Sequence, residues 1–253
     1  MHKPFNCRAY SAMLIAGVFI LLTPPLAQAQ TILDTDGDGL SDVQEQSVYH
    51  TDPQASDTDG DGFSDGQEIS TDYSPRHGGK KKLVEVDSDD DSLNDAWEIA
   101  IGTDLANPDT DNDSHQDGTE VGAGYDPLSP APVKKEKTIT ITLKNQRLVY
   151  AFDGITLDEF SISSGLPRTP TPVGTFAVLD KIPVKHYGGT GFDYPNTKWN
   201  LHFTTGKYRY YIHGAYWHDN FGRPMSHGCV NVAYKNMERL YTFANPGTRV
   251  IIR

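Results

Sequence analysis

The C-terminal half of the chain shows the alternation of apolar and polar positions that is typical of β-strands. This period of two predicts strands at residues 138–143, 146–152, 174–179, 208–213 and 248–252. Apolar residues at Met237, Leu240 and Tyr241 predict one short helix within residues 233–244. The pattern therefore predicts a mainly β fold, a compact sandwich or barrel that carries a short helix.

A short apolar stretch near the N-terminus has the features of a secretory signal. A positively charged flank precedes an apolar run over residues 13–22, and Ala27 and Ala29 stand where a signal peptidase reads small residues. The run is shorter than the roughly 18 apolar residues that a membrane span needs. We therefore expect residues 1–29 to be removed on export. The remaining chain would lie in the periplasm, in the cell wall or outside the cell, with no membrane span.

Charged residues are distributed unevenly along the chain. Residues 31–130 contain 26 acidic and 4 basic residues, whereas residues 131–253 contain 16 basic and 8 acidic residues. So acidic a segment, with few large apolar side chains, cannot bury enough surface to fold unaided. We therefore predict an acidic module over residues 30–130 and a β-rich module over residues 137–253, joined by a linker at residues 131–136. The β-rich module is expected to fold independently.

The acidic module contains four 12-residue segments that align without gaps and begin at Asp34, Asp57, Asp87 and Asp109. Each has carboxylates at positions 1, 3, 5, 9 and 12, which is the oxygen-ligand spacing of a calcium loop. Such carboxylates would repel one another without a cation. Ca²⁺ is therefore the expected structural cofactor, and catalysis is expected to need none. The candidate ligands are Asp34, Asp36, Asp38, Asp42, Glu45, Asp57, Asp59, Asp61, Asp65, Glu68, Asp87, Asp89, Asp91, Asp95, Glu98, Asp109, Asp111, Asp113, Asp117 and Glu120.

These loops resemble bacterial thrombospondin type 3 repeats, which share recurring Thr-Asp and Asp-Pro elements such as those at Asp52 and Asp126. Paired EF-hands need a helix on each side of every loop, and residues 46–56 leave no room for two. Dockerin modules use two such loops, not four. Repeats 3 and 4 depart from the pattern at position 6, where Ser92 and Ser114 replace glycine.

Because Cys7 belongs to the removed segment, Cys229 is the single cysteine of the exported chain, and no internal disulfide can form. A lone thiol in an oxidising compartment is either an inert buried residue or a reactive nucleophile. His227 is close to it in sequence, and His213 ends a predicted strand from which it can reach across a loop. A free thiol has a pKa near about 8.5, so an adjacent imidazole is the common means of activating it. Flanking glycines, such as Gly228, let backbone amides approach a substrate carbonyl.

The motif Ser-His-Gly-Cys-Val-Asn over residues 226–231, preceded by the His-Gly pair that starts at His213, resembles the L,D-transpeptidase (YkuD-type) signature. Residues 171–176 and 216–222 resemble two further segments of that family, and the resemblance covers residues 137–253. It implies that Cys229 is the nucleophile and His213 the general base. His227 would line the site, and the amides of Gly228 and Cys229 would contribute to oxyanion stabilisation.

The same resemblance places further residues at the substrate. These are Ser226, Tyr216, Trp217, Arg223 and Asn231. The pattern varies at Ala215, where a hydroxyl residue is frequent, and at Asn231, where arginine is frequent. His186, His202 and His218 lack a motif partner and are expected to be surface or packing residues.

The activity that the resemblance implies is acyl transfer on peptidoglycan stem peptides. Cys229 would attack the carbonyl of the third stem residue, release D-alanine and pass the acyl group to an amine, which gives a 3→3 cross-link. Water as acceptor would make the chain an L,D-carboxypeptidase, and a protein lysine would make it an anchoring enzyme with an acceptor protein as partner. No nucleic-acid partner is expected.

Three other readings of the chain are open. One is a non-catalytic, calcium-dependent wall-binding or adhesion protein, although the presence of both Cys229 and His213 argues against it. Another is a structural zinc site at His213, His227 and Cys229, which lacks a fourth spaced ligand. The last, a papain-like protease, would require a matching cysteine near the start of the exported chain.

Overall fold

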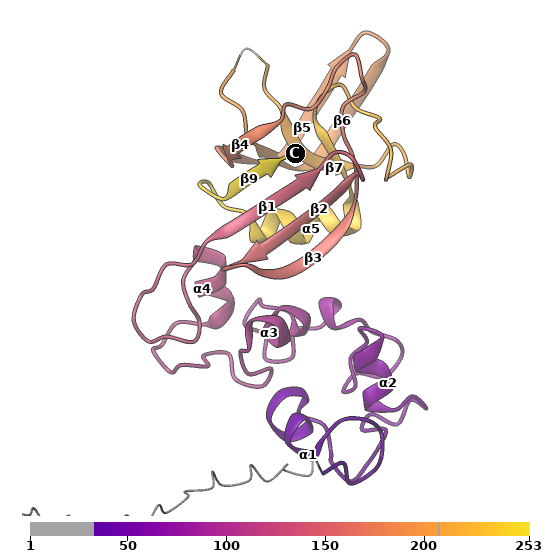
Figure 1. Cartoon of the computed structure of the whole chain (residues 1–253), viewed down its shortest axis with the longest axis vertical. Helices are drawn as coiled ribbons and strands as arrows, with labels where there is room; N and C mark the ends of the chain where they lie inside the picture. The colour runs from indigo at the N-terminus through magenta and orange to yellow at the C-terminus, as the bar shows by residue number, and fades with distance from the viewer. Residues whose placement is uncertain (1–32, 207) are drawn as a thin grey trace, which may run out of the picture. The chain divides into compact units, whose positions relative to one another are not determined.

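The structure, a computed structural model, describes residues 33–206 and 208–253 (Figure 1). The predicted secretory signal, residues 1–29, lies outside the described residues. Residues 33–253 form one compact unit. Across the described part of the chain, every helix is too short or too polar to cross a bilayer.

In the acidic region, each 12-residue loop leads into a short helix that begins at position 9 of the loop. In three of the four loops the residue at position 8 caps the helix: Ser41, Ser64 and Asn94 each accept a hydrogen bond from the backbone amide three residues later. Gln116, at position 8 of the fourth loop, makes no such side-chain bond. The carboxylates at positions 9 and 12 thereby fall in the first helical turn, where the helix dipole favours negative charge. The elements are α1 (Asp42–Gln44) with the π turn η1 (Glu45–Tyr49), α2 (Asp65–Ser70), the 3-10 turn η2 (Leu83–Glu85), α3 (Asp95–Ile101) and α4 (Asp117–Ala123).

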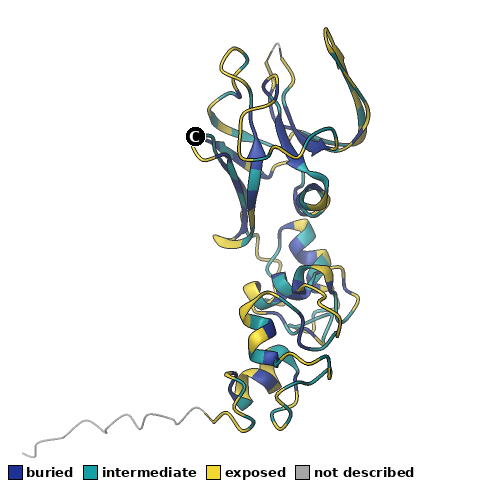
Figure 2. Cartoon of the chain, turned by 90° about the vertical axis from the view of Figure 1, so that its right-hand side faces the viewer, coloured by how far each residue is buried: buried dark blue, intermediate teal, exposed yellow. Residues whose placement is uncertain are grey.

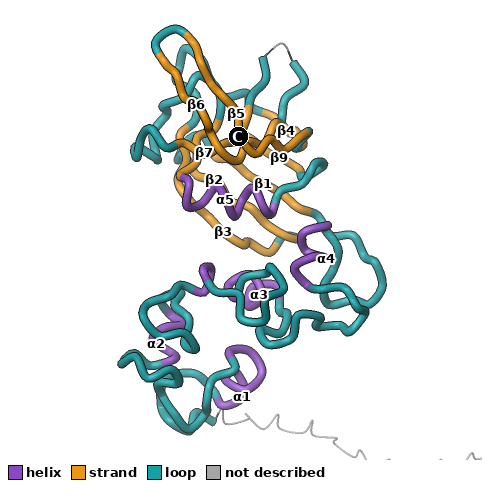
Figure 3. Tube along the Cα trace, turned by 180° about the vertical axis from the view of Figure 1, so that it is seen from behind, coloured by secondary structure: helices purple, strands orange, loops and turns teal. Residues whose placement is uncertain are grey.

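The C-terminal region is built on a sheet that, within the described residues, has nine strands in the order β4-β9-β1-β2-β3-β8-β7-β6-β5 (Figures 1 and 3). Most neighbours are antiparallel, but β1 pairs with β9 and β7 pairs with β8 in parallel. The strands are β1 (Lys137–Thr142), β2 (Arg147–Phe152), β3 (Ile155–Ser163), β4 (Gly174–Ala177), β5 (Asp180–Gly189), β6 (Phe192–His202), β7 (Tyr211–Ala215), β8 (Val230–Ala233) and β9 (Arg249–Ile252).

One helix, α5 (Tyr234–Phe243), packs on this curled sheet and closes its core (Figures 2 and 3). Its apolar face places Met237, Leu240 and Phe243 among the buried residues of the strands. The strand β1 shows why the sequence folds this way, because its alternate residues are buried from end to end. The prediction of a mainly β domain with a short helix is confirmed.

The alternation of apolar and polar residues did not predict four of the strands. The long hairpin of β5 and β6 contains Pro183 and Pro195, residues that normally argue against a strand. Much of it is exposed, so it lacks the clean alternation of a half-buried strand. The strand β3 carries Asp158 and Glu159 in its middle, and β8 is only four residues long. The missed hairpin matters because it supplies one wall of the site.

Candidate functional site

The parallel pairing of β7 with β8 brings the predicted thiol and imidazole together. His213 on β7 is the register partner of Asn231 on β8, and Ile212 is the partner of Val230. Cys229 directly precedes β8 and therefore lies beside Tyr211 at the edge of the same pair. Both Cys229 and His213 line one cavity of about 140 Å³. Its other lining residues are Tyr187, Phe192, Tyr194, Trp217, Met225, Ser226, His227 and Asn231.

A row of buried polar residues crosses four strands at this point. Ser163, Asn231, His213 and Asn200 are successive register partners on β3, β8, β7 and β6. Each is at most 3% exposed. Adjacent partners in a sheet project on the same face, so the row forms a polar strip in an otherwise apolar sheet. Buried polar groups are costly unless partnered, and those of the strip are hydrogen-bonded, Ser163 to Asn220 and Asn200 to Ile182 among them. His213 and Asn231 are the two members of the strip that line the cavity.

The surroundings of His213 fix its protonation. Burial above all, and to a lesser degree the nearby His218, lowers the pKa of the imidazole to about 4, although the hydrogen bond to Gly214 raises it. The ring is therefore neutral at neutral pH. Its Nδ1 lies 2.9 Å from the carbonyl oxygen of Gly214, so Nδ1 carries the proton and donates it. Nε2 is then the unprotonated nitrogen, which is the form that a general base requires.

Burial acts on the thiol in the opposite direction. It raises the pKa of Cys229 to about 11, although a backbone hydrogen bond from Tyr211 and the positive charge of Lys185 both lower it. Cys229 is therefore a neutral thiol at rest, beside a neutral imidazole. These two pKa shifts favour proton transfer during nucleophilic attack over a preformed thiolate–imidazolium pair.

The turn that carries Cys229 is held by Ser226. The Ser226 hydroxyl donates to the carbonyl oxygen of Cys229 and accepts the amide of Gly228 at 3.1 Å. Gly228 has φ +115, and a Cβ at this position would meet the Tyr210 ring at 2.2 Å. Glycine is required there on both counts. The Gly228 amide that the sequence assigns to an oxyanion site is thus already engaged by Ser226, so it would have to leave Ser226 to serve a substrate.

The wall opposite Cys229 is aromatic and comes from the missed hairpin. Tyr187 on β5 stacks on His213 with ring centroids 4.6 Å apart, and its hydroxyl donates to Asn200 at 2.9 Å. Phe192 stacks on His227 at 5.0 Å, which holds this imidazole at the cavity rim. Sequence analysis missed these residues, because the hairpin of β5 and β6 reaches the site only through the pairing of β6 with β7.

The other predicted substrate contacts divide into two groups. Trp217, Ser226 and Asn231 line the cavity, whereas Tyr216 is 49% exposed and Arg223 is exposed outside the lining. Trp217 stacks closely on Tyr194, with centroids 3.8 Å apart.

His218, assigned from sequence to packing or surface, has a partner in the site. Its Nε2 lies 3.0 Å from the side-chain amide nitrogen of Asn231. It therefore orients a residue of the buried polar row, and it brings a second imidazole close to that of His213. No short sequence motif links His218 to Asn231, so the sequence held no signal for this contact.

The four acidic loops converge as the spacing predicts. In every loop the carboxylates at positions 1, 3 and 5 can place one oxygen each within 4.8 Å of the others. The position-12 glutamates are buried, and one oxygen of each has no hydrogen-bond partner in the described structure. These orphaned atoms are Oε2 of Glu45, Glu68, Glu98 and Glu120. At position 3, Oδ2 of Asp36, Asp59, Asp89 and Asp111 is likewise unpartnered.

The electrostatics of the loops show the same lack of a counter-charge. Burial above all, together with the negative charges of Asp89 and Asp91, raises the pKa of Glu98 to about 9. Burial, followed by neighbouring aspartates, also raises the pKa of Glu68 and of Glu120 to about 7. Clustered hard oxygen donors of this kind fit a calcium ion, because the cation supplies the charge that the carboxylates lack.

The position-9 carboxylates also hold each loop together through hydrogen bonds. Both oxygens of Asp65 are engaged by Thr58, at 2.9 Å to its amide and 2.6 Å to its hydroxyl. The same two bonds recur at position 9 of the other three loops. The position-9 residues Asp42, Asp65, Asp95 and Asp117 therefore fasten each loop to the start of its helix, and their carboxylates are already occupied.

The loops form two pairs. Oδ2 of Asp38 in repeat 1 accepts the amide of Gly66 in repeat 2 at 2.7 Å, and Asp91 in repeat 3 accepts the amide of Gly118 in repeat 4 at 2.7 Å. A Cβ at either glycine would meet the backbone oxygen of that aspartate, at 2.3 and 2.5 Å. Glycine at position 10 of the even repeats is therefore the sequence signal for this pairing, which sequence analysis missed.

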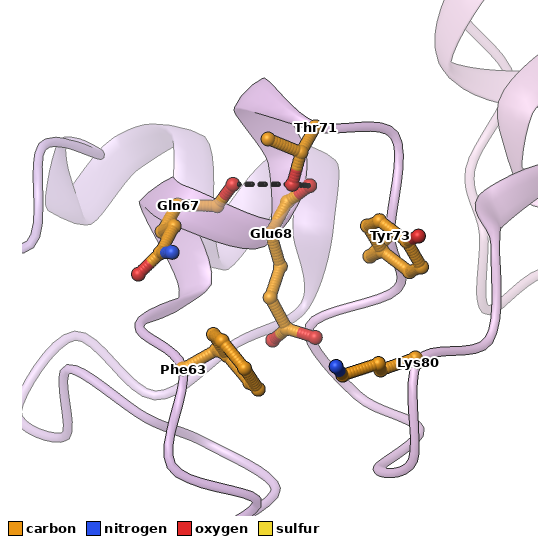
Figure 4. Close-up of a pocket in the computed structure, with 6 residues that line it drawn as sticks. All are labelled: Phe63, Gln67, Glu68, Thr71, Tyr73 and Lys80. Atoms are coloured by element: carbon orange, nitrogen blue, oxygen red, sulfur yellow. Dashed lines mark hydrogen bonds between the residues drawn. The ribbon is translucent and has the colours of Figure 1, made fainter.

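A small pocket of about 210 Å³ opens beside the second loop (Figure 4). The carboxylate of Glu68 points between Phe63 and Lys80, whose ammonium lies 5.5 Å from the centroid of the Phe63 ring. Thr71 fixes the end of the helix by donating to the carbonyl of Gln67 at 2.8 Å. The pocket is thus built around a residue of the second loop.

Comparison with known proteins identifies both regions. The sequence profile of the L,D-transpeptidase catalytic domain (YkuD) matches residues 136–252, and that of the bacterial TSP3 repeat matches residues 34–55 and 57–71. Residues 136–252 are thus similar to the L,D-transpeptidase (YkuD) catalytic domain, and the first part of the acidic region is similar to bacterial TSP3 repeats. A search of curated proteins found no match.

Solved structures similar to this chain are L,D-transpeptidases. One from Mycobacterium smegmatis is 26% identical over 48% of this chain and 60% of its own, with a TM-score of 0.44. One from Enterococcus faecium is 29% identical over 49% and 52%, with a TM-score of 0.43. The catalytic domain of the E. faecium enzyme is 29% identical over 47% of this chain and 97% of its own, with a TM-score of 0.41. The chain thus spans 60% and 52% of the first two proteins.

Proposed function

We propose that this chain is an exported, cysteine-dependent L,D-transpeptidase that acts on peptidoglycan stem peptides. The observation that carries the proposal is the shared cavity of Cys229 and His213, in which a hydrogen bond leaves Nε2 of the neutral imidazole free to accept a proton. The basic balance of the catalytic half suits a substrate that bears carboxylates.

The proposed reaction has two half-reactions. As the sulfur of Cys229 attacks the carbonyl of the third stem residue, His213 takes the thiol proton. The bond to the terminal D-alanine breaks, its amine receives that proton, and a thioester remains on Cys229. In the second half-reaction His213 deprotonates an incoming amine, which attacks the thioester, forms a new amide and regenerates the thiol.

The surrounding residues have separate parts in this scheme. Ser226 holds the turn that presents Cys229, and Tyr187 covers His213 and keeps it neutral. The aromatic wall keeps water from the thioester, which favours an amine acceptor over hydrolysis. The amide of Cys229 is the candidate oxyanion donor that Ser226 leaves unused, because Ser226 takes the amide of Gly228.

We further propose that the acidic repeats bind Ca²⁺ through positions 1, 3, 5 and 12 of each loop. The unpartnered, buried oxygens of the position-12 glutamates support this assignment, since buried charges are otherwise paired. When bound, Ca²⁺ supplies the positive charge that these carboxylates lack. The position-9 aspartates keep the loop geometry instead.

The acceptor decides the reaction class and is settled by product analysis. The exported chain is incubated with disaccharide-tetrapeptide, and the products are separated and weighed by mass spectrometry. A cross-linked dimer supports transpeptidation, whereas tripeptide alone supports the carboxypeptidase alternative. No turnover, with calcium binding retained, would favour a non-catalytic wall-binding protein.

A further inference from the structure

The two pairs of repeats differ in what their helices contact. In the second pair, Leu93, Trp97 and Ile101 from repeat 3 and Val121 from repeat 4 belong to the same buried cluster as the strands of the catalytic domain. In the first pair, Gln44 and Val48 occupy the positions that correspond to Trp97 and Ile101. Both of these residues are exposed.

Trp97 is the centre of this contact. Its ring meets the edge of Tyr150 on β2 at 5.8 Å and of Phe243 on α5 at 6.1 Å, both in T-shaped geometry. The side chain is 5% exposed, so nearly all of a large aromatic surface is buried against the catalytic domain. Truncation of a buried aromatic side chain of this size leaves a cavity and destabilises the core around it.

A second contact ties repeat 4 to the first strand. Lys137 begins β1 and is 7% exposed, and its ammonium donates to the carbonyl oxygens of Val121 at 3.0 Å and Gly122 at 2.9 Å. It also lies 4.5 Å from the centroid of the Phe243 ring. The last carbonyls of α4 thus stabilise a buried cation of the catalytic domain.

The same two helices carry the candidate ion ligands. On α3, Trp97 faces the catalytic core, and the next residue, Glu98, is fully buried with one carboxylate oxygen unpartnered. On α4, Glu120 occupies the corresponding position and directly precedes Val121. Helices of seven residues are too short to be stable alone, so their placement depends on the loops that they complete.

We infer that ion binding by repeats 3 and 4 stabilises the catalytic domain itself, whereas repeats 1 and 2 form a separately ion-dependent segment. Glu98 and Glu120 hold α3 and α4 against their loops when their charge is neutralised. These helices then supply Trp97, Val121 and the carbonyl acceptors of Lys137 to the catalytic core. This inference rests on the proposed calcium binding and replaces the sequence-based expectation of an independent catalytic module.

Hydrogen–deuterium exchange of the full exported chain tests the inference, read by mass spectrometry over peptides of β1, β2 and α5. Calcium at about 100 times its dissociation constant should raise the protection of their globally exchanging amides about 100-fold for each coupled site, or about 10⁴-fold for repeats 3 and 4 together, over that in chelator. The Glu98→Gln variant should lose the share of repeat 3, about 100-fold, in the presence of calcium. The matched Glu45→Gln variant, altered at the same position of repeat 1, should keep it.

A second variant distinguishes the packing of Trp97 on the catalytic domain from calcium binding itself. Trp97→Gln places in repeat 3 the residue type of Gln44 in repeat 1. Titration calorimetry should show that this variant still binds calcium. Its peptides of β1, β2 and α5 should nevertheless lose their calcium-dependent protection. Calcium-dependent exchange confined to residues 33–130, with the catalytic peptides unchanged in every variant, would overturn the coupling and leave calcium binding intact. Exchange that is independent of calcium throughout the chain, with no binding heat, would instead overturn the proposed calcium sites.

Discussion

Tyr187 on β5 stacks on His213 on β7, with ring centroids 4.6 Å apart and planes 28° from parallel. This contact covers one face of an imidazole that is 3% exposed. Because burial is the largest cause of the lowered pKa of His213, the stacked ring contributes to the neutral state of the proposed base. The hydroxyl of Tyr187 is anchored on Asn200, so the cover is fixed from the neighbouring strand.

Removing the cover should therefore move the acid limb of the pH–rate profile. In the wild type, kcat/KM should stay level as pH falls through 6.5 and decline only as it approaches about 4, where His213 gains a proton. In Tyr187→Ala, water reaches the ring and the limb should shift upward toward 6.5. Tyr187→Phe keeps the stack and should keep the wild-type limb. An identical limb in all three proteins would show that Tyr187 does not control the protonation of His213.

The resting state of the thiol can be measured by alkylation. With the pKa of Cys229 raised to about 11 by burial, the thiolate fraction at pH 7 is small. The rate of iodoacetamide labelling should therefore climb continuously from pH 7 toward 11. A thiolate–imidazolium pair would give a rate that is already level from about pH 5, and that result would exclude the neutral pair described here.

The turn before Cys229 should tolerate no side chain at Gly228. Gly228→Ala adds a strained positive φ, which costs about 1–3 kcal/mol, and a collision with Tyr210, which costs about as much again. Gly222 also has positive φ, at +97, but has open space around its Cβ position, so Gly222→Ala is the matched control. Denaturant unfolding should show the larger loss for Gly228→Ala, together with loss of D-alanine release. Equal losses would mean that the contact with Tyr210 is relieved elsewhere.

The pairing of repeats predicts a difference between two glycines of one helix. Gly118→Ala would press a methyl group against the backbone oxygen of Asp91, whereas Gly122→Ala meets nothing within 4 Å. Titration calorimetry with calcium should show affinity about tenfold weaker or worse for Gly118→Ala, because the position-5 ligand is displaced. Gly122→Ala should bind like the wild type. Unchanged affinity in Gly118→Ala would argue that the loops act singly.

The sequence predicted the candidate site residues where they belong to one contiguous motif. The spacing of the four acidic loops and the residues around Cys229 placed the candidate ligands and the thiol, and the alternation in β1 and β2 predicted the sheet. It was uninformative where distant segments meet. Proline in β5 and β6 concealed the aromatic wall that holds Tyr187. Nothing local to Trp97 showed that its partner Tyr150 lies more than fifty residues away, across the predicted domain boundary.

The most direct test of the proposed enzyme is the mass of the acyl-enzyme. The chain from residue 30 onward is mixed with a stem tetrapeptide, quenched in acid and weighed intact, and the adduct is located by fragmentation. The account predicts a gain equal to the tripeptide acyl group on Cys229, with one D-alanine released for each adduct. Cys229→Ala should stay folded and unmodified, and His213→Ala should form the adduct about 10²–10⁴ times more slowly. D-alanine release by Cys229→Ala at the wild-type rate, or an adduct on any other residue, would contradict the account.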